Sequence, residues 1–555
     1  MAASTIADWP SKFDNTLLNE LRQEEIGKPP HEPREVHGAH YTLVRPSVPA
    51  PQPSLAACSQ EVADMLGIDP DDEDFVRIFS GGWLPDRVTC WATVYGASAA
   101  GTYAGQRGDG RAISICQVAD LEVQLKGAGT TPYSRQFDGR AVLRSCVREF
   151  LASEAMAALG VPTTRALCVV ASGDLVDRAW YADTGYEVMN LEPGAVGTRV
   201  AKSFLRFGQF ELFWQRGEMV LLQELAEHAL SREFSHLRIQ YPFEPLSGLL
   251  VCMFAEICER QAVLVAEWLR VGYCQGNMNS DNAALGGITL DYGPFAFMER
   301  FQPLYNPWVG GGRMYAFDKQ PQATRMNLEL LSEVFVDLVK RVCDSEGLPD
   351  SEKQAAVKDV HHSVSTKFVE AFKRHHKDNC CRKLGLAVWD DVAYELWDEL
   401  SQLMSSRSGN EGVDFTLLFR NLVDVPLDVE MDGEEERLLD FVGRAALEDV
   451  HAWPADHRSD WVRWAHRYRQ HVNQQGLEST ERRHMMNSAN PKYILRNWMA
   501  AEAYEGASGG DYTVLRELHA VLSNPYDEQG HEADERWARP TPVWARDRAG
   551  ITYMS

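Results

Sequence analysis

The chain has 555 residues, of which 45% are hydrophobic and 24% charged, and its formal net charge is −25. These proportions are ordinary for a soluble globular protein, and the length admits about three or four domains or one large catalytic unit with extensions. An acidic field of this size repels phosphate, so it argues against nonspecific binding to nucleic acid or to anionic membranes. A phosphate-binding site in this chain therefore requires a local cluster of Arg and Lys.

The 11 cysteines are scattered and lie mostly in apolar segments. This pattern is typical of small buried side chains in a reducing compartment rather than of a disulfide framework. One cluster, His375, His376, Cys380 and Cys381, has a helical spacing that a zinc ion could use. No CxxC pair completes such a set, and we favour the alternative, a polar helix end.

Neither the N-terminus nor the most apolar segment predicts a secreted or membrane protein. The first residues lack the long apolar core of a secretory signal, and they are neither Arg-rich nor free of acids, as a transit peptide would be. Residues 249–271 are apolar but interrupted by charges such as Glu256 and Arg260, which predicts a buried helix. We expect a soluble intracellular protein, cytoplasmic or located in mitochondria or another organelle.

The chain begins with a Pro-rich stretch and then reaches a Gly-rich segment. Residues 1–58 read as an extended arm. Gly96–Gly110 contains five glycines and precedes two predicted strands, Ala112–Val118 and Leu121–Lys126. In the second strand apolar and polar residues alternate, which predicts a half-buried strand with Lys126 on its polar face. Nucleotide-binding proteins use Gly-rich turns followed by such a lysine to cover phosphates, although this segment is not a GxxxxGK[ST] loop.

A helix is predicted for Ala141–Leu159, because Gly160 follows it directly and Pro162 lies just beyond. Glu149 lies at the edge of its apolar stripe. A strand lysine paired with a glutamate on the next helix is the positioning pair of protein kinases. The alternatives are that Glu149 is a solvated surface residue, or that Glu154 is the partner of Lys126.

Two arginines, Arg199 and Arg206, follow another predicted strand, Ala166–Ala171. Their separation corresponds to two turns of a helix or to opposite faces of a strand. A planar guanidinium group can donate to two phosphate oxygens at once, so the two arginines suit a polyphosphate. The alternative is that both are solvated.

From Gln209 onward the sequence is predominantly helical. The periodic segments are 210–230, 249–271, 326–344, 351–374, 390–407, 460–475, 490–505 and 512–522.

The helical part is interrupted by a loop-rich segment, Gly286–Gly312. The stretch Cys274–Pro294 overlaps it and holds the adjacent pair Asp281 and Asn282, a predicted short strand Ile288–Leu290, and Asp291. Carboxylate and amide oxygens of this kind hold Mg²⁺ while it carries nucleotide phosphates. The alternative is a hairpin in which Asp and Asn only stabilise turns.

Several longer strings carry a resemblance to a known family. They are GQRGDGRA, LEVQLKGAGTTPYSRQFDGRAVLR, SCVREFLASEAMAALGVPTTRAL, RVAKSFLRFG, MNSDN, LDYGPFAFME and NPKYILRNWMAAEA. Through them the chain resembles the selenoprotein O family of protein adenylyltransferases, from about Phe13 to Trp544. The resemblance implies an α+β fold of the two-lobed protein-kinase-like type, with a mixed β/α N-lobe and a large helical C-lobe. It also implies an atypical kinase that transfers AMP from ATP to Ser, Thr or Tyr hydroxyls of proteins.

The resemblance also implies roles for individual residues. Asp281 would accept the proton, and Asn282 and Asp291 would bind Mg²⁺ or Mn²⁺. Glu149 would pair with Lys126, and Arg199 and Arg206 would hold the terminal phosphates. The other residues at the nucleotide would be Gly108, Gly110, Arg111, Lys126, Asp138 and Gly139.

On this basis the expected divisions are an arm at 1–58, an N-lobe at 59–208, a C-lobe at 209–480 and a C-terminal helical extension and tail at 481–555. The expected partners are ATP and protein substrates, with no nucleic acid or membrane, and the protein is expected to be a monomer. The alternatives to adenylyl transfer are ordinary phosphoryl transfer and a silent nucleotide-binding scaffold.

Three positions differ from the family's usual strings. Residues 96–101 read GASAAG where GHQFG is frequent, and Gln275 stands where a His is frequent. The C-terminus, ITYMS, lacks the cysteine or selenocysteine often found there, so redox regulation through that residue is not predicted.

Overall fold

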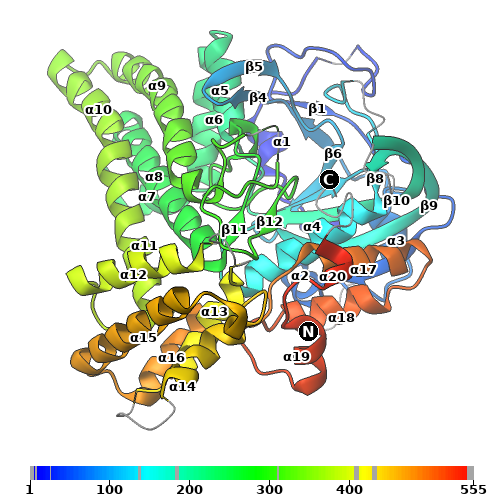
Figure 1. Cartoon of the computed structure of the whole chain (residues 1–555). Helices are drawn as coiled ribbons and strands as arrows, with labels where there is room; N and C mark the ends of the chain where they lie inside the picture. Colours follow the sequence, from blue (N-terminus) through cyan, green and yellow to red (C-terminus); the bar gives the residue numbers. More distant parts are fainter. Residues whose placement is uncertain are drawn as a thin grey trace.

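An antiparallel sheet lies beside a body of long helices in the computed structural model (Figure 1). The structure describes residue 6, residues 9–25, 27–135, 139–181, 187–308, 310, 312–405, 412–427 and 434–546. The protein is therefore a mixed α+β protein, as the sequence predicts.

The main sheet has eight strands, in the order β1-β3-β6-β7-β10-β9-β2, with β8 paired to β10. All of these neighbours are antiparallel. The strands are β1 (Tyr41–Leu43), β2 (Ser54–Cys58), β3 (Trp91–Thr93), β6 (Ala112–Val118), β7 (Leu121–Lys126), β8 (Ala141–Val142), β9 (Arg165–Tyr181) and β10 (Glu187–Ala201). Two small hairpins stand apart from it, β4 (Gly96–Ala99) with β5 (Thr102–Gln106), and β11 (Tyr273–Cys274) with β12 (Ala296–Phe297).

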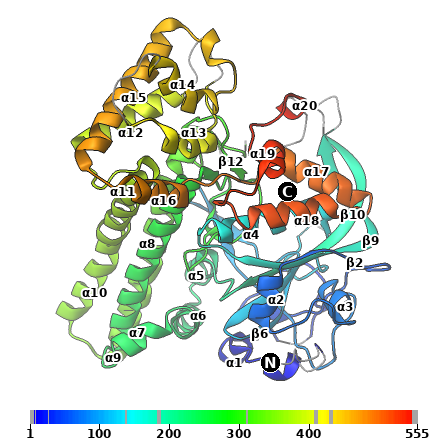
Figure 2. The ribbon, with the colours of Figure 1, turned by 90° about the horizontal axis from the view of Figure 1, so that it is seen from below.

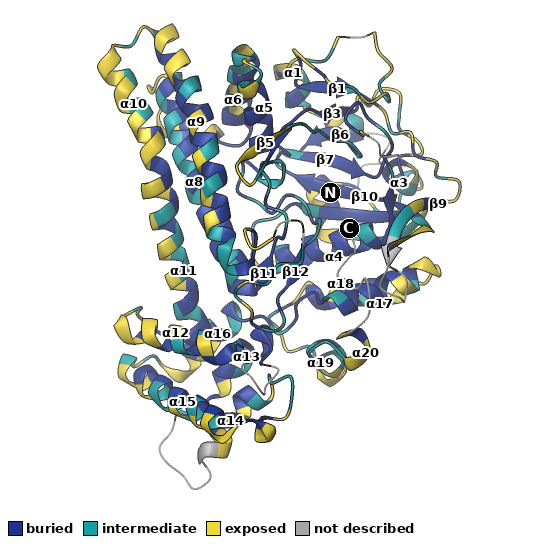
Figure 3. Ribbon diagram, turned by 45° about the horizontal axis from the view of Figure 1, so that its top comes forward, coloured by how far each residue is buried: buried dark blue, intermediate teal, exposed yellow. Residues whose placement is uncertain are grey.

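The bounds of β6 and β7 agree with the prediction, but the prediction that β7 is half-buried is wrong. Its polar residues, Glu122, Gln124 and Lys126, are buried as well as its apolar ones. Figure 3 shows the centre of the sheet, including β6, β7 and β10, buried over most of its length. Residue alternation identifies the two faces of a strand, but it cannot tell what covers each face.

The long helices lie on one side of the molecule and most of the sheet lies on the other (Figures 1 and 2). The helices before residue 210 are α1 (Thr16–Glu20), α2 (Gln60–Leu66), α3 (Phe75–Phe79), α4 (Leu143–Ala158) and α5 (Phe207–Gln215). The next are α6 (Met219–Arg232), α7 (Ser235–Gln240), α8 (Leu246–Val271), α9 (Gln320–Glu346), α10 (Asp350–Ser363), α11 (Val369–Leu384), α12 (Asp391–Met404) and α13 (Phe415–Asn421). The last are α14 (Glu434–Gly443), α15 (Ala455–Gln475), α16 (Ser479–Ala489), α17 (Asn497–Ser508), α18 (Thr513–Leu522), α19 (His531–Trp537) and α20 (Val543–Arg546).

Short helical turns complete the secondary structure. They are η1 (Trp9–Lys12), η2 (Ser280–Asn282), η4 (Phe317–Lys319), η5 (Val364–Phe368), η6 (Leu422–Asp424) and η7 (Val450–Ala452). The single helix predicted at 210–230 is divided into α5 and α6, because Gly217 between them has a φ of +68°. The buried helix predicted at 249–271 is α8, and among the described residues no helix is long and apolar enough to cross a membrane.

The strand predicted at Ile288–Leu290 is absent, since this segment forms only isolated bridges through Thr289 to Thr163 and Ala283. The amide of Thr289 donates to the carbonyl of Pro162 at 2.9 Å. The segment is therefore fixed to the chain that follows α4 and does not pair along its length with a neighbouring strand.

The His and Cys cluster singled out in the sequence lies on α11. Cys380 is buried, and its Sγ lies 3.7 Å from Nε2 of His376. Across the described ranges, no three His, Cys, Asp or Glu side chains gather into a group that could hold a metal ion.

Buried ion pairs of one arginine connect the C-terminal helices to the middle of the chain. Arg496, just before α17, contacts Asp414 at 2.6 Å and Glu299 at 3.0 Å. Arg496 and Asp414 are almost fully inaccessible, at 1% and 0% side-chain exposure. A buried ion pair adds little stability compared with a well-packed apolar pair, but the loss of one partner leaves an uncompensated charge.

We expect Arg496→Met to destabilise the protein by about 3 kcal/mol or more, because Asp414 then stays buried without its cation. The matched control is Arg444→Met, which removes the exposed ion pair between Arg444 and Asp424. Such an exposed pair contributes less than about 1 kcal/mol of stability. Thermal melting of both variants measures the difference. Equal melting temperatures would show that the buried ion pairs have no such role.

Candidate active site

The loop between α8 and α9 carries the predicted catalytic and metal residues. It leaves α8 at Gly272, and the hairpin of β11 and β12 closes the part of the loop that carries Asp281, Asn282 and Asp291. At Gly276, which has a φ of +73°, a Cβ would lie only 1.9 Å from the carbonyl oxygen of Pro294. This close approach requires glycine. Inside the loop, Asp281 and Asn282 lie on the short turn η2.

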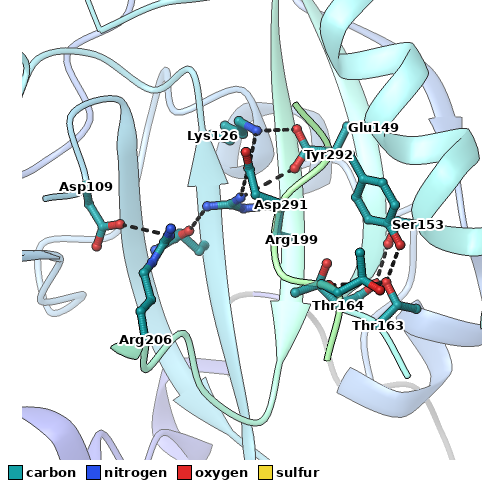
Figure 4. A network of polar contacts seen from close by, with 12 residues as sticks. Asp109, Lys126, Glu149, Ser153, Thr163, Thr164, Arg199, Arg206, Asp291 and Tyr292 are labelled. Atoms are coloured by element: carbon teal, nitrogen blue, oxygen red, sulfur yellow. Dashed lines mark hydrogen bonds and ion pairs between the residues drawn. The ribbon is translucent and has the colours of Figure 1, made fainter. Parts of the chain in front are cut away.

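Four charged side chains from four different segments meet in one ion cluster (Figure 4). Nζ of Lys126 on β7 contacts Glu149 on α4 at 2.6 Å and Asp291 in the loop at 2.7 Å. Nη1 of Arg199 on β10 contacts the same Oδ1 of Asp291 at 2.8 Å and Glu149 at 3.5 Å. Two cations and two carboxylates thus form a network, which we call the ion cluster. Of the two possible partners for Lys126, the structure has Glu149, since Glu154 is bound to Ser59 and Arg165.

The ion cluster keeps Asp291 ionised. Burial alone would raise the pKa of this carboxyl, but the charges of Lys126 and Arg199 hold the pKa well below its usual value. Among the described residues, the hydrogen bonds and ion pairs of the Asp291 side chain all involve Oδ1. Its second oxygen, Oδ2, is therefore not engaged by either cation.

Arg206 lies next to the ion cluster but on a different element from Arg199, so neither spacing considered for the pair, one helix or one strand, is correct. Arg199 is on β10, whereas Arg206 is the N-cap residue of α5. Nη1 of Arg206 donates to the carbonyl of Asp281 at 2.7 Å. Its Nη2 lies 3.6 Å from Asp109, and its guanidinium lies 4.4 Å from the centre of the Tyr95 ring. Arg206 thus fixes the backbone of Asp281 against the Gly-rich segment.

Asp281 has the properties of a carboxyl group that can take up a proton. Burial raises its pKa, and the charge of Arg206 opposes that rise. Within the described part of the chain, Oδ1 of Asp281 is buried without a hydrogen-bond partner, as are Nε of Arg199 and Nε of Arg206. Buried polar atoms without partners are uncommon in folded proteins. Their concentration here indicates that a polar ligand completes the site.

Helix α4 holds the Asp291 loop as well as supplying Glu149. Arg148 donates to the carbonyl of Gly293 at 2.8 Å and to that of Phe295, and its guanidinium lies 3.8 Å from the centre of the Phe295 ring. Burial lowers the pKa of Arg148 to about 10, which still leaves it charged at neutral pH. On its other side α4 lies against α17 and α18 (Figures 1 and 2), and Arg148 reaches Asn497 of α17 at 3.5 Å.

The hairpin of β4 and β5 is fastened to the loop that carries Asp281. Glu211 on α5 accepts hydrogen bonds from Ser98 at 2.8 Å and from Ser280 at 2.7 Å. The amide of Ser98 also donates to Oγ of Ser280 at 2.7 Å. Burial raises the pKa of Glu211, although both hydroxyls lower it. We call this set of contacts the hairpin latch.

The other predicted nucleotide residues lie around these groups. Gly108 and Gly110 flank Asp109, and a Cβ on either would meet Tyr133, at 2.4 Å and 2.8 Å respectively. Gly139 has a φ of +72°, and a Cβ on this residue would lie only 2.1 Å from the carbonyl carbon of Gly129. These glycines therefore permit close packing of neighbouring loops, which is a sufficient structural reason for glycine at each position.

Arg111 and Asp138 complete the predicted set. The amide of Gly127 donates to the carbonyl of Arg111 at 2.7 Å, so Arg111 lies beside the end of β7 that carries Lys126. Asp138 lies outside the described residues.

Sequence reasoning missed several residues that hold the site together. Gln124 accepts a hydrogen bond from Arg199, and its place two residues before Lys126 on the same strand face was a usable signal. Gln275 donates to the carbonyl of Asp291 at 3.0 Å. Glu211 had no sequence signal, because its partners, Ser98 and Ser280, are distant in the chain.

The residues present fit a hard divalent cation such as Mg²⁺. Asn282 uses Nδ2 to donate to the carbonyl of Asn277 at 3.3 Å, and among the described residues its Oδ1 makes no hydrogen bond. That amide oxygen and Oδ2 of Asp291 are the type of ligand that Mg²⁺ takes. Mg²⁺ is commonly held by one or two side chains together with substrate phosphates, so a larger protein cluster is not required.

The class of protein that fits this geometry is a nucleotide-dependent transferase, because a lysine and two arginines gather beside acidic groups in an otherwise acidic protein. The chain belongs to the protein adenylyltransferase SelO family, whose model matches residues 28–523. The resemblance stated from the sequence is thus confirmed.

Relatives of the chain match it over nearly its whole length. A protein nucleotidyltransferase YdiU from Azoarcus sp. (strain BH72) is 39% identical over 558 residues, which cover 98% of this chain and 99% of the relative. Proteins of the same name from Aromatoleum aromaticum and Rhodopirellula baltica are 36% and 37% identical, and each match covers 98% of both chains.

The contact between α5 and the hairpin gives a direct test of this geometry. A Cβ on Gly208 would lie 2.1 Å from the carbonyl oxygen of Gly96 and 3.5 Å from Cα of Asp281. We expect Gly208→Ala to push the hairpin away, to cost about 1–3 kcal/mol of stability, and to weaken nucleotide binding.

The control is Gly443→Ala at the end of α14, where a Cβ would make an ordinary contact of 3.6 Å with Val450. It should leave both quantities nearly unchanged. Thermal melting and calorimetric titration with ATP measure them. A Gly208→Ala protein that melts and binds ATP as the wild type does would contradict this geometry.

Proposed function

We propose that the protein transfers AMP from ATP to Ser, Thr or Tyr hydroxyls of other proteins and releases pyrophosphate. The observation that carries this proposal is the ion cluster with Arg206 beside it, which concentrates three cations in a protein with a net charge of −25. Membership of the protein adenylyltransferase SelO family supports the same reaction.

We further propose that the fold is of the two-lobed protein-kinase type. Residues 59–208, with most of the sheet and α4, would be the N-lobe, and residues 1–58 would be an arm that adds β1 and β2 to the sheet. The helical part, 209–480, would be the C-lobe, followed by the extension and tail at 481–555. The pairing of a strand lysine with a glutamate of the next helix supports this, because kinases position their lysine in the same way.

The reaction joins the acceptor oxygen to the α-phosphorus and breaks the bond between that phosphorus and the bridging oxygen of pyrophosphate. Negative charge therefore accumulates on the leaving β- and γ-phosphates. Lys126, Arg199 and Arg206 would bind those phosphates and stabilise the charge as it develops. Gly108, Gly110, Arg111, Asp138 and Gly139 would surround the rest of the nucleotide.

Asp281 would orient the acceptor hydroxyl and take its proton at Oδ1. The raised pKa of this residue favours that role, because a base is most effective when its pKa lies nearer the working pH. Arg206 holds the backbone of Asp281, so the same arginine links the base to the phosphate side of the site.

Asn282 and Asp291 would hold Mg²⁺, or Mn²⁺ in its place. When bound, the ion would neutralise phosphate charge and orient the phosphates for displacement. The release of Asp291 from its two cations would be favourable once phosphates replace it as their partner.

Two other functions fit the same groups less well. An ordinary protein kinase separates its catalytic Asp from its metal-binding Asn in the pattern HRDxxxxN, whereas Asp281 and Asn282 are adjacent. A silent pseudokinase scaffold would bind nucleotide without catalysis, yet it would not need the carboxylate of Asp281 with a raised pKa and an unpartnered oxygen.

The partners would be ATP and protein substrates, with no nucleic acid or membrane, and the protein would act as a monomer. All 11 cysteines are free, which supports an intracellular, reducing location such as the cytoplasm, mitochondria or another organelle.

A labelling experiment tests the reaction itself. Incubation with a candidate protein substrate, Mg²⁺ and ATP labelled at the α-phosphate should label the substrate, and ATP labelled at the γ-phosphate should not. Asp291→Ala should lower the transfer rate by at least about a hundredfold, whereas Asp440→Ala, at an exposed position of α14, should have no effect. Transfer of the γ-label alone would refute adenylylation, and full activity of Asp291→Ala would refute the role of that residue.

The pH dependence of transfer tests the role of Asp281. The charge of Arg107 lowers the pKa of Asp281, and Arg107 makes no side-chain hydrogen bond or ion pair with the described residues. Removal of that charge in Arg107→Gln should raise the pKa, so the acidic limb of the kcat/KM profile should move to higher pH. Arg341→Gln on the surface of α9 is the control and should keep the wild-type profile. A limb that stays in place in Arg107→Gln would contradict the assignment of Asp281 as the base.

A further inference from the structure

A row of buried polar side chains crosses the centre of the sheet and ends at Arg199. It contains Gln117 and Ser114 on β6, Glu122 and Gln124 on β7, and Arg199 on β10. None of these residues is more than 4% exposed. The three strands are neighbours in the sheet, which places the side chains within reach of one another.

The side chains are joined by consecutive hydrogen bonds. Nη2 of Arg199 donates to Oε1 of Gln124, and Nε2 of Gln124 donates to Oγ of Ser114 at 3.2 Å. Oγ of Ser114 then donates to Oε1 of Glu122 at 2.6 Å. From the far side, Nε2 of Gln117 donates to Oε2 of Glu122 at 3.2 Å. The carboxylate of Glu122 is thus the common acceptor.

Only one direction of these hydrogen bonds is consistent with Arg199. A guanidinium group has donors and no acceptor, so Gln124 must present its carbonyl oxygen to it. The NH₂ group of Gln124 then faces Ser114, which accepts that bond and has a single proton to give to Glu122. An unprotonated oxygen on Glu122 is needed to receive it.

The same guanidinium belongs to the ion cluster. Nη1 of Arg199 contacts Asp291 and Nη2 contacts Gln124, so the two ends of the group are fixed from opposite sides. If phosphates replaced Asp291 as the partner of Nη1, the contact with Gln124 would remain. Gln124 is therefore placed to keep Arg199 in position during an exchange of its anionic partner.

We propose that Gln124 is a positioning residue that holds Arg199 for binding of the ATP phosphates, and that Glu122, by accepting the proton of Ser114, supports the orientation of the Gln124 amide that Arg199 requires. The proposal rests on the proposed function insofar as it takes ATP as the ligand. It adds two residues that do not themselves touch the nucleotide.

The charge on Glu122 is sensitive to pH near neutrality. Burial raises the pKa of Glu122 to about 7, while the hydrogen bond from Ser114 and the charge of Arg232 on α6 lower it and Asp109 raises it. Cys116 on β6 also lies near, but burial raises its own pKa far enough to keep the thiol neutral. Above about pH 7 the carboxylate of Glu122 is ionised, and all the hydrogen bonds from Arg199 to Glu122 are donated in one direction. Below that pH, protonated Glu122 can donate to Ser114, and the proton of Ser114 can then compete with Arg199 for the carbonyl oxygen of Gln124.

The first test compares two replacements of a buried amide by an apolar side chain of similar shape. Gln124→Met removes the acceptor of Arg199, and Asn379→Leu removes an amide on α11 that donates to the carbonyl of Ala266 and to Glu267, far from the site. We expect both to lower the melting temperature. Only Gln124→Met should raise the Kd for ATP in the presence of Mg²⁺, by about tenfold, as measured by calorimetric titration. An unchanged Kd in Gln124→Met would show that the amide is merely structural.

The second test asks whether Glu122 acts through Gln124. Glu122→Gln should raise the Kd for ATP, and the double variant Glu122→Gln/Gln124→Met should have the Kd of Gln124→Met alone. Additive effects in the double variant would overturn the link between the two residues.

The third test uses pH, because a packing defect would not depend on it. The ratio of the Kd at pH 6 to the Kd at pH 8 should be larger for the wild type than for Gln124→Met or Glu122→Gln, since ATP titrates equally in all three. Equal ratios would overturn the role of Glu122. Because these tests measure ATP binding, they decide the inference even if AMP transfer is not observed, and a wild type that does not bind ATP would overturn it.

Discussion

One oxygen of Asp291 is shared by a lysine and an arginine, and the architecture around the site depends on this shared contact. The cations come from β7 and β10, and their carboxylate partners come from α4 and from the loop after α8. Removal of either carboxylate would leave a cation with an uncompensated charge in a largely buried place, which is costly. The ion cluster therefore holds the sheet, α4 and the loop in one arrangement. If phosphates replace Asp291 as proposed, the positive charge of Lys126 and Arg199 becomes available to them.

The surrounding contacts limit how far the groups of the ion cluster can move. Arg148 holds the backbone after Asp291, and Gln275 holds the carbonyl of Asp291 itself. The hairpin latch fixes the turn that carries Asp281, and Arg206 holds the carbonyl of that residue. Most of these contacts are made to the backbone, so they can remain in place when the carboxylates of the loop change partners. Such support is what a site needs when its charged groups change partners.

Much of the local structure could be predicted from the sequence, because it depends on neighbouring residues. The alternation in Leu121–Lys126 identified β7 with its correct bounds, and Gly160 marked the end of α4. The pairing of Lys126 with Glu149 also followed from their order on a strand and the next helix. Burial of the polar face of β7 could not be predicted, because it depends on α4 and on a loop 165 residues away in the chain. For the same reason the placement of Arg199 and Arg206 on different elements, and the hairpin latch between residues 182 apart, were not evident. Within the site, Asp281, Asn282 and Arg206 could be singled out from residue type and spacing, and the resemblance to a family supplied their individual roles. Glu211 needed the structure, and Gln124 had a signal only in its place on the same strand face as Lys126.

The central claim is that the ion cluster exchanges Asp291 for nucleotide phosphates while a divalent ion takes up the freed carboxylate. A crystal structure with a non-hydrolysable ATP analogue and Mn²⁺, located by its anomalous scattering, tests this most directly. The account predicts one or more Mn²⁺ peaks bound by oxygens of Asn282 and Asp291, with Lys126, Arg199 and Arg206 in contact with phosphate oxygens. It also predicts that Arg199 has left Asp291 and kept Gln124. A metal bound elsewhere, or phosphates bound away from these cations with Arg199 still on Asp291, would contradict it.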